Sequence, residues 1–188
     1  MKKILIFIII MLISINKIYA MSESQILPIS EGVENAKIEV IVYESLSCSY
    51  CAKFHEDVYP KLKEEFIDTG MVKIIFKHFP LDMAALNASK IAQCKNDGKS
   101  DLLHLLFKKQ SIWLKGETLK DINKNLESVL KEENIEIDFS SCIDNSSIED
   151  FVLNNRIEGV KKFEVNSTPT IIINNKKFKE SLTFKNLK

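Results

Sequence analysis

The sequence predicts an α/β fold in which a β-α-β unit and a β-hairpin are separated by a long helical stretch. Residues 37–46 and 71–79 are apolar, β-branched runs, and the segment between them has a helical pattern. Residues 81–165 then show helical periodicity, and strand-like runs resume at 169–178. A strand, a crossover helix and a second strand of these lengths form a parallel, right-handed unit.

The first strand is nearly continuously apolar, which is typical of a strand buried on both faces. In the helix that follows, an apolar side chain recurs at every fourth residue: Phe54, Val58, Leu62 and Phe66. Pro60 lies inside this helix and is expected to kink or split it near Tyr59, because proline has no N–H to donate. Gly70 is expected to end it.

Four more helices are predicted in the middle of the chain, over Met83–Lys95, Lys99–Trp113, Thr118–Glu132 and Ser147–Phe163. The hairpin strands at 169–173 and 176–178 flank Asn174-Asn175, a pair suited to a tight turn with positive φ. Residues 21–36 are expected to be an irregular lead-in, and residues 181–188 to begin a helix.

The first twenty residues predict export. Lys2 and Lys3 precede an apolar stretch of about a dozen residues, which is shorter than a membrane span, and Ala20 offers a small residue for cleavage. This pattern indicates a signal peptide over residues 1–20; the alternative is an uncleaved membrane anchor. The 26 basic and 26 acidic residues are scattered, so no nucleic-acid partner is expected.

Cys48-Ser49-Tyr50-Cys51 lies where the first strand gives way to the helix. At a helix N-terminus, the unpaired N–H groups and the helix dipole favour a thiolate, so this motif indicates thiol–disulfide exchange. In an oxidising compartment the other cysteines are candidates for a second bridge, Cys94–Cys142. Two buried free thiols are the alternative.

Cys48, Cys51 and His55 also permit a different hypothesis, a non-enzymatic periplasmic protein that binds copper or zinc. The fourth ligand of a structural zinc site is missing, so we expect no metal and expect His55 to be an exposed helical residue. No motif implies an organic cofactor. His78 and His104 are expected to be structural.

At this point the chain resembles the DsbA-like thiol:disulfide oxidoreductases of the alphaproteobacterial type, which have a thioredoxin fold interrupted by a helical domain. The resemblance rests on residues 44–55 around the cysteine motif, and on four shorter segments: Pro60-Lys61-Leu62-Lys63, Asp68-Thr69-Gly70, Phe79-Pro80-Leu81-Asp82 and Val165-Asn166-Ser167-Thr168-Pro169-Thr170. It implies a thioredoxin-like domain over 21–80 and 165–188, with an inserted helical domain over 81–164.

The resemblance also implies roles for individual residues. Cys48 matches the exposed nucleophile and Cys51 the buried partner that resolves mixed disulfides. Pro169 matches a cis-proline facing the cysteines, and Thr168 the residue whose backbone pairs with substrate. Ser49 and Tyr50 match the two residues that tune the nucleophile, and Cys94–Cys142 resembles a structural disulfide of some alphaproteobacterial relatives.

Two departures from the family pattern affect the expected chemistry. Strongly oxidising members carry Pro-His between the cysteines, whereas Tyr50 cannot become cationic, so weaker stabilisation of the Cys48 thiolate is expected. Many relatives also have a buried acid six residues before the nucleophile, where this chain has Val42. Glu44, on the same strand face, is either a partial substitute or an ordinary strand-end carboxylate.

The expected function is therefore a periplasmic oxidoreductase that exchanges disulfides with secreted proteins as they fold, mainly as a dithiol oxidase. By family resemblance, a quinone-linked membrane partner would reoxidise it. The same residues can also act as a reductase or isomerase, because the direction depends on reduction potential and partners.

Overall fold

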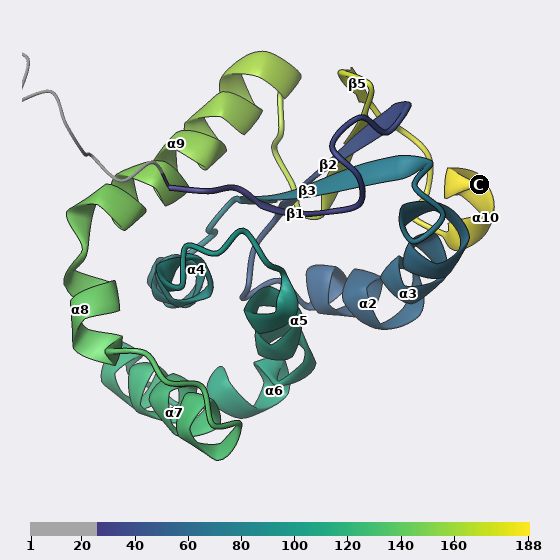
Figure 1. The fold of residues 1–188 in the computed structure, drawn as a ribbon. Helices are drawn as coiled ribbons and strands as arrows, with labels where there is room; N and C mark the ends of the chain where they lie inside the picture. The colour runs from purple at the N-terminus through teal and green to yellow at the C-terminus, as the bar shows by residue number, and fades with distance from the viewer. Residues whose placement is uncertain (1–25) are drawn as a thin grey trace, which may run out of the picture.

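The computed structural model describes residues 26–188, so the predicted signal peptide lies outside the described residues. Its five strands form one sheet in the order β1-β3-β2-β4-β5 (Figure 1). The strands are β1 (Ile29–Glu31), β2 (Ile38–Glu44), β3 (Val72–His78), β4 (Thr170–Ile173) and β5 (Lys176–Lys177).

The centre of the sheet is the predicted β-α-β unit, in which β2 and β3 pair in parallel. Strand β4 pairs antiparallel with the other side of β2, and β5 follows it as a hairpin through Asn174 and Asn175, both with positive φ. The expectation of an irregular lead-in was wrong for Ile29–Glu31, which pairs antiparallel with β3. Three residues are too short to show a strand periodicity, so only the tertiary pairing defines β1.

The helices after β2 cover one face of the sheet: α2 (Ser49–Asp57), α3 (Tyr59–Leu62) and a single π-helical turn, Lys63–Ile67. The helix is interrupted between Asp57 and Tyr59, as Pro60 predicts. The short helix α10 (Phe184–Leu187) lies beside α3 (Figure 1).

The helical segment between β3 and β4 is built around α4 (Met83–Cys94), which is buried along nearly its whole length. Figure 1 shows α4 almost end-on with the other helices around it: α5 (Asp101–Lys108), α6 (Gln110–Trp113), α7 (Leu119–Glu132), α8 (Phe139–Asp144) and α9 (Ser146–Phe163). The single helix predicted over Lys99–Trp113 is broken at Lys109, and Trp113 turns back to donate its indole N–H to the Leu106 carbonyl (2.8 Å).

Both faces of the sheet are buried, which explains the continuous apolar sequence of β2. Val42 and Phe76 belong to the large cluster that includes α2, α4 and α5. Tyr43 points to the opposite face, where it contacts Phe163 at the end of α9. Gly159 allows α9 to pack closely on Tyr43, because a Cβ at residue 159 would lie 2.8 Å from the Tyr43 ring.

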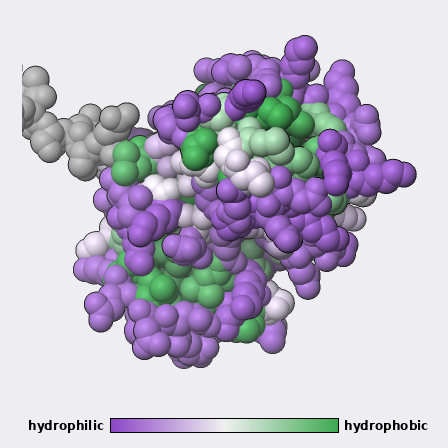
Figure 2. Space-filling model, turned by 45° about the vertical axis from the view of Figure 1, so that its right-hand side comes forward, coloured by the Kyte–Doolittle hydropathy of each residue, from purple (hydrophilic) through white to green (hydrophobic). Residues whose placement is uncertain are grey.

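The face shown in Figure 2 is mostly hydrophilic, with hydrophobic side chains gathered near the top and over the helical region below. Within residues 26–188, no helix combines the length and the apolar character needed to cross a bilayer.

A disulfide joins the end of α4 to α8 through Cys94 and Cys142, whose Cα atoms lie 5.6 Å apart. The two cysteines are 48 residues apart in the sequence, so the bridge closes most of the helical segment into a loop. Cys142 is buried in the main core. The bridge therefore restrains the packing of α8 against α4.

We predict that replacing Cys94 and Cys142 together with Ala lowers thermal stability. A loop of this length contributes about 4 kcal/mol on the chain-entropy model, which corresponds to a decrease in Tm on the order of 10 °C for a chain of this size. Calorimetry of the oxidised proteins measures the difference. Both proteins in strong reductant, which also reduces Cys48 and Cys51 in each of them, are the matched control, and their Tm values should then be similar. A variant whose Tm equals that of the oxidised wild type would contradict the structural role.

Candidate active site

Cys48 is the N-cap residue of α2, directly before the first helical residue Ser49. Its backbone is extended, and its carbonyl accepts hydrogen bonds from the N–H groups of Cys51 (3.1 Å) and Ala52 (3.2 Å). Gln110, from α6, donates to the carbonyls of Leu46 (2.7 Å) and Cys48 (3.0 Å). One amide of the helical segment therefore fixes the backbone on both sides of the strand-to-helix turn.

Thr168 and Pro169 approach Cys48 from the loop before β4. The peptide bond between them is cis, and the Cys48 thiol donates to the Thr168 carbonyl at 3.3 Å. The Thr168 hydroxyl is buried and has no hydrogen-bond partner among residues 26–188. It is thus available as a donor to a Cys48 thiolate.

Several donors lower the pKa of the Cys48 thiol to about 5. The largest contribution is the hydrogen bond from the Cys51 thiol; the Thr168 side chain and the backbone N–H groups of Cys51 and Tyr50 add to it, while partial burial opposes them. All of these donors stabilise the charged form, as expected at a helix N-terminus. Cys48 is therefore mostly thiolate at neutral pH.

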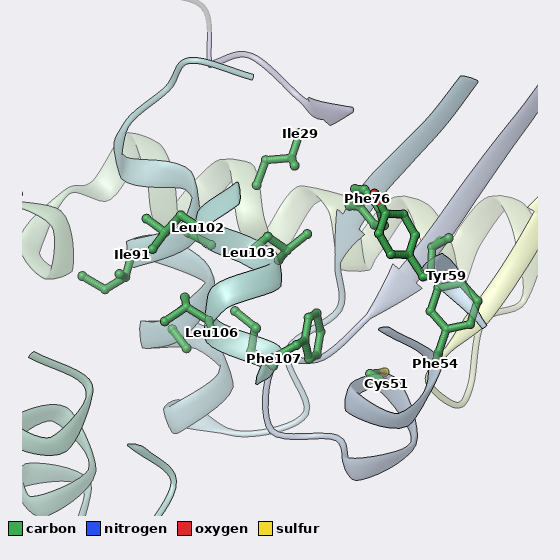
Figure 3. Packing of buried hydrophobic residues seen from close by; sticks show 14 of the residues in the cluster. Ile29, Cys51, Phe54, Tyr59, Phe76, Ile91, Leu102, Leu103, Leu106 and Phe107 are labelled. Carbon is green, nitrogen blue, oxygen red and sulfur yellow. The ribbon is translucent and has the colours of Figure 1, made fainter. Parts of the chain in front are cut away.

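Cys51 lies one turn into the helix and is fully buried. Figure 3 shows it at the start of α2, between Phe107 of α5 and Phe54. Burial raises the pKa of the Cys51 thiol, and its hydrogen bond to Cys48 and the nearby charge of Glu44 raise it further. The pair thus combines a reactive thiolate with a protonated, protected thiol.

The expectation that His55 is an exposed helical residue was wrong. Its ring is buried, with Nε2 2.7 Å from the Glu44 carboxylate and Nδ1 2.9 Å from Nδ1 of His104. Glu44 itself is only 2% exposed. Of the two sequence interpretations of Glu44, the structure therefore matches the buried acid near the cysteines.

The metal hypothesis requires a free ring nitrogen on His55. Both ring nitrogens of His55 are engaged with protein groups. No group of three His, Cys, Asp or Glu side chains among residues 26–188 is arranged to hold a metal ion.

The structure brings four of the sequence-predicted site residues together: Cys48, Cys51, Thr168 and Pro169. Ser49 and Tyr50 are exposed between the cysteines, Tyr50 at 74%. Cys94 and Cys142 bond to each other in the helical segment, separate from the free pair.

Sequence reasoning missed three residues near the site, namely Gln110, His104 and Glu31. Nothing local in the sequence distinguishes them, because each reaches the site only through the packing of α5, α6 or β1. Glu44 and His55 were weakly indicated, because both lie within four residues of the cysteine motif in the sequence.

Comparisons with known proteins agree with this geometry. A family model described as thioredoxin matches residues 25–188. The crystal structure of Wolbachia pipientis alpha-DsbA1 is 31% identical, with a TM-score of 0.70, over 81% of this chain and 79% of that chain.

Two curated relatives are similar over most of this chain. A putative protein-disulfide oxidoreductase of Rickettsia bellii is 30% identical over 76% of this chain and 55% of its own length. Disulfide bond formation protein D of Bacillus subtilis is 28% identical over 84% of this chain and 72% of its own length. The chain thus spans about half the length of the Rickettsia relative.

The expected fold class is confirmed, since the sheet, the helical segment between β3 and β4, and the solved relative all agree. Because the family model covers all of the described residues, the chain belongs to the thioredoxin family and has the DsbA-like form of its fold.

Proposed function

We propose that this protein is a disulfide oxidoreductase that exchanges disulfides with secreted proteins through Cys48 and Cys51. The observation that carries the proposal is the opposite environment of the two free thiols at one helix N-terminus. The pKa of Cys48 is lowered to about 5 and that of Cys51 is raised. The names of the relatives, one a putative protein-disulfide oxidoreductase and the other a disulfide bond formation protein, support the same chemistry.

In the oxidase direction, a substrate thiolate attacks the Cys48 sulfur of the Cys48–Cys51 disulfide. The Cys51 sulfur leaves and takes a proton, and a mixed disulfide remains on Cys48. A second substrate thiolate then attacks the substrate sulfur of that bond and releases Cys48 as a thiolate, which its low pKa makes a good leaving group. The backbone of Thr168, beside Cys48, would pair with the substrate peptide.

The proposal includes three further parts. The protein acts as an oxidase, it is located in the periplasm, and a quinone-linked membrane protein reoxidises it. A stable Cys48 thiolate stabilises the reduced form, and this makes the disulfide form an oxidant. The same residues would serve a reductase or isomerase if the partners supplied electrons.

A single-turnover assay tests the activity. The oxidised protein is mixed with a reduced, unfolded protein that contains two cysteines, and mass spectrometry follows the disulfide. We expect one substrate disulfide per Cys48–Cys51 pair, no product with Cys48→Ser, and unchanged yield with a chelator. The Cys94→Ala/Cys142→Ala protein is the control and should remain active; a wild-type protein that oxidises no substrate would refute the proposal.

A second prediction concerns the nucleophile. Because the Cys48 pKa is about 5 and a free cysteine has a pKa of about 8.5, iodoacetamide should label Cys48 of the reduced protein rapidly at pH 6.5. The labelling rate should rise as pH increases through about 5 and then level off, since the thiolate is the reactive form. Cys51 should remain unlabelled. Equal labelling of both residues, or a midpoint near 8.5, would contradict the assigned roles.

A third prediction concerns Tyr50. Tyr50→His places a group that can become cationic beside the thiolate and should lower the Cys48 pKa by about one to two units, or roughly 1.4 to 2.7 kcal/mol. The reduction potential should rise by roughly 30 to 60 mV, because 30 mV corresponds to about 1.4 kcal/mol for a two-electron couple. A glutathione titration measures this change. Tyr50→Phe is the uncharged control, and an equal shift in both variants would show that charge is not the cause.

A further inference from the structure

A chain of four titratable side chains leads away from Cys51 through the core. Glu44 of β2 contacts Nε2 of His55 on α2 (2.7 Å), and Nδ1 of His55 contacts Nδ1 of His104 on α5 (2.9 Å). His104 Nε2 then contacts the Glu31 carboxylate on β1 (2.8 Å). Four separate elements therefore supply one continuous row of hydrogen-bond contacts.

Aromatic rings seal the sides of this chain. Phe107 stacks on His55 with ring centroids 4.1 Å apart, and Tyr59 stacks on His104 at 4.4 Å. Phe54 and Phe76 also contact His55. The polar atoms of the chain therefore contact one another along its length, while aromatic rings occupy its sides.

The two ends of the chain have different environments. At the inner end, Glu44 is buried near Cys51, and its Oε1 has no hydrogen-bond partner among the described residues. At the outer end, Glu31 and His104 line a pocket of about 970 Å³, together with Lys63 and Ser100. His55 also borders this pocket, but its side chain is only 5% exposed. This pocket is the point at which the chain reaches solvent.

Glu31 is held as an anion at the pocket end. Burial would raise its pKa, but hydrogen bonds from His104, Ser100 (2.5 Å), Tyr59 (2.5 Å) and Lys63 (3.1 Å) together hold the pKa well below its usual value. A fixed carboxylate there accepts an N–H from His104 and orients the ring.

The chain has fewer N–H groups than hydrogen-bond contacts, and this allows a proton to move along it. Three contacts join two imidazoles, and two neutral imidazoles supply only two N–H groups. With both carboxylates ionised, one contact therefore lacks a proton. That vacancy can lie at the Glu44 end or at the Glu31 end, and moving it between the ends carries one proton along the chain without moving a heavy atom.

We propose that four side chains form a proton relay: Glu44, His55, His104 and Glu31. The relay connects the Cys51 thiol with solvent in the pocket that α2 and α5 line. The inference rests on the proposed thiol–disulfide exchange. When Cys51 resolves a mixed disulfide, the Cys51–Cys48 sulfur bond forms and the bond from Cys48 to the bound thiol breaks. The electron pair leaves on that thiolate, and the Cys51 proton passes to Glu44.

The reverse step uses the same path. When a thiolate opens the Cys48–Cys51 bond, the Cys51 sulfur receives a proton from the relay. One full redox cycle thus carries a proton in and then out. The first passage moves the missing proton position from one end of the chain to the other, and the second passage returns it. A substrate that covers Cys48 and Thr168 leaves this route open, because neither residue lines the pocket.

A chromogenic aromatic disulfide tests the relay. The Cys48 thiolate of the reduced protein releases one coloured thiolate, and Cys51 then releases the second when it closes the ring. The first phase reports the nucleophile and therefore the proposed function. The second phase requires loss of the Cys51 proton and reports the relay.

We expect His104→Ala to slow the second phase by about tenfold or more, up to the roughly hundredfold or larger effects typical of general acid–base catalysis, and to leave the first phase unchanged. Added imidazole should restore the second phase, because the pocket beside residue 104 can admit it, and the restored rate should increase with imidazole concentration. Lys108→Ala is the matched control, since Lys108 lines the same pocket from α5 but is not a member of the relay; its second phase should match the wild type.

Each remaining outcome has a defined meaning. A second phase within about twofold of wild type in His104→Ala, or a slow phase that imidazole does not restore, would overturn the relay. Absence of the first phase in the wild type, or its persistence in Cys48→Ser, would instead refute the proposed function.

Discussion

The chemistry of this protein depends on one helical turn that separates a thiol in contact with solvent from a thiol that is not. Cys48 is the N-cap residue of α2, where donors gather, and Cys51 faces the core three residues later. The hydrogen bond from Cys51 to Cys48 acts in opposite directions on the two groups, since it stabilises one thiolate and holds the proton of the other thiol. An asymmetric pair therefore arises from two identical side chains.

The helical segment does more than cover the sheet. Through Gln110 it fixes the carbonyls of Leu46 and Cys48, and through α5 it brings His104 and Phe107 against α2. The disulfide between α4 and α8 restrains the same segment at its opposite side. The environment of Cys48 and Cys51 is thus shared between two parts of the chain that the sequence separates widely.

The sequence predicted those parts of the fold that depend on local patterns. The β-branched run of β2, the break at Pro60 and the Asn174-Asn175 turn all appear close to their expected positions. The burial of His55 was not predicted, because it depends on partners that lie 11 and 49 residues away in the chain. The hydrophobic periodicity of a sequence indicates which face of an element is buried. It does not indicate which polar group of a neighbouring element a side chain will contact.

The same limit explains β1. Its three residues carry too little pattern to identify a strand, yet Glu31 binds a histidine 73 residues later. Burial also differs along the site: Glu44 sits in the closed interior, and Glu31 sits at the pocket rim. Distant packing therefore places charged groups beside the site that the motif alone does not predict.

The edge position of β1 has a consequence for protein engineering. A minimal version of this fold, trimmed back to begin at β2, would keep both cysteines, the cis-proline loop and the whole helical segment. It would nevertheless expose the backbone groups of β3 that β1 now covers, which is the kind of open edge that invites aggregation. It would also leave His104, Tyr59, Lys63 and Ser100 without the carboxylate around which they converge.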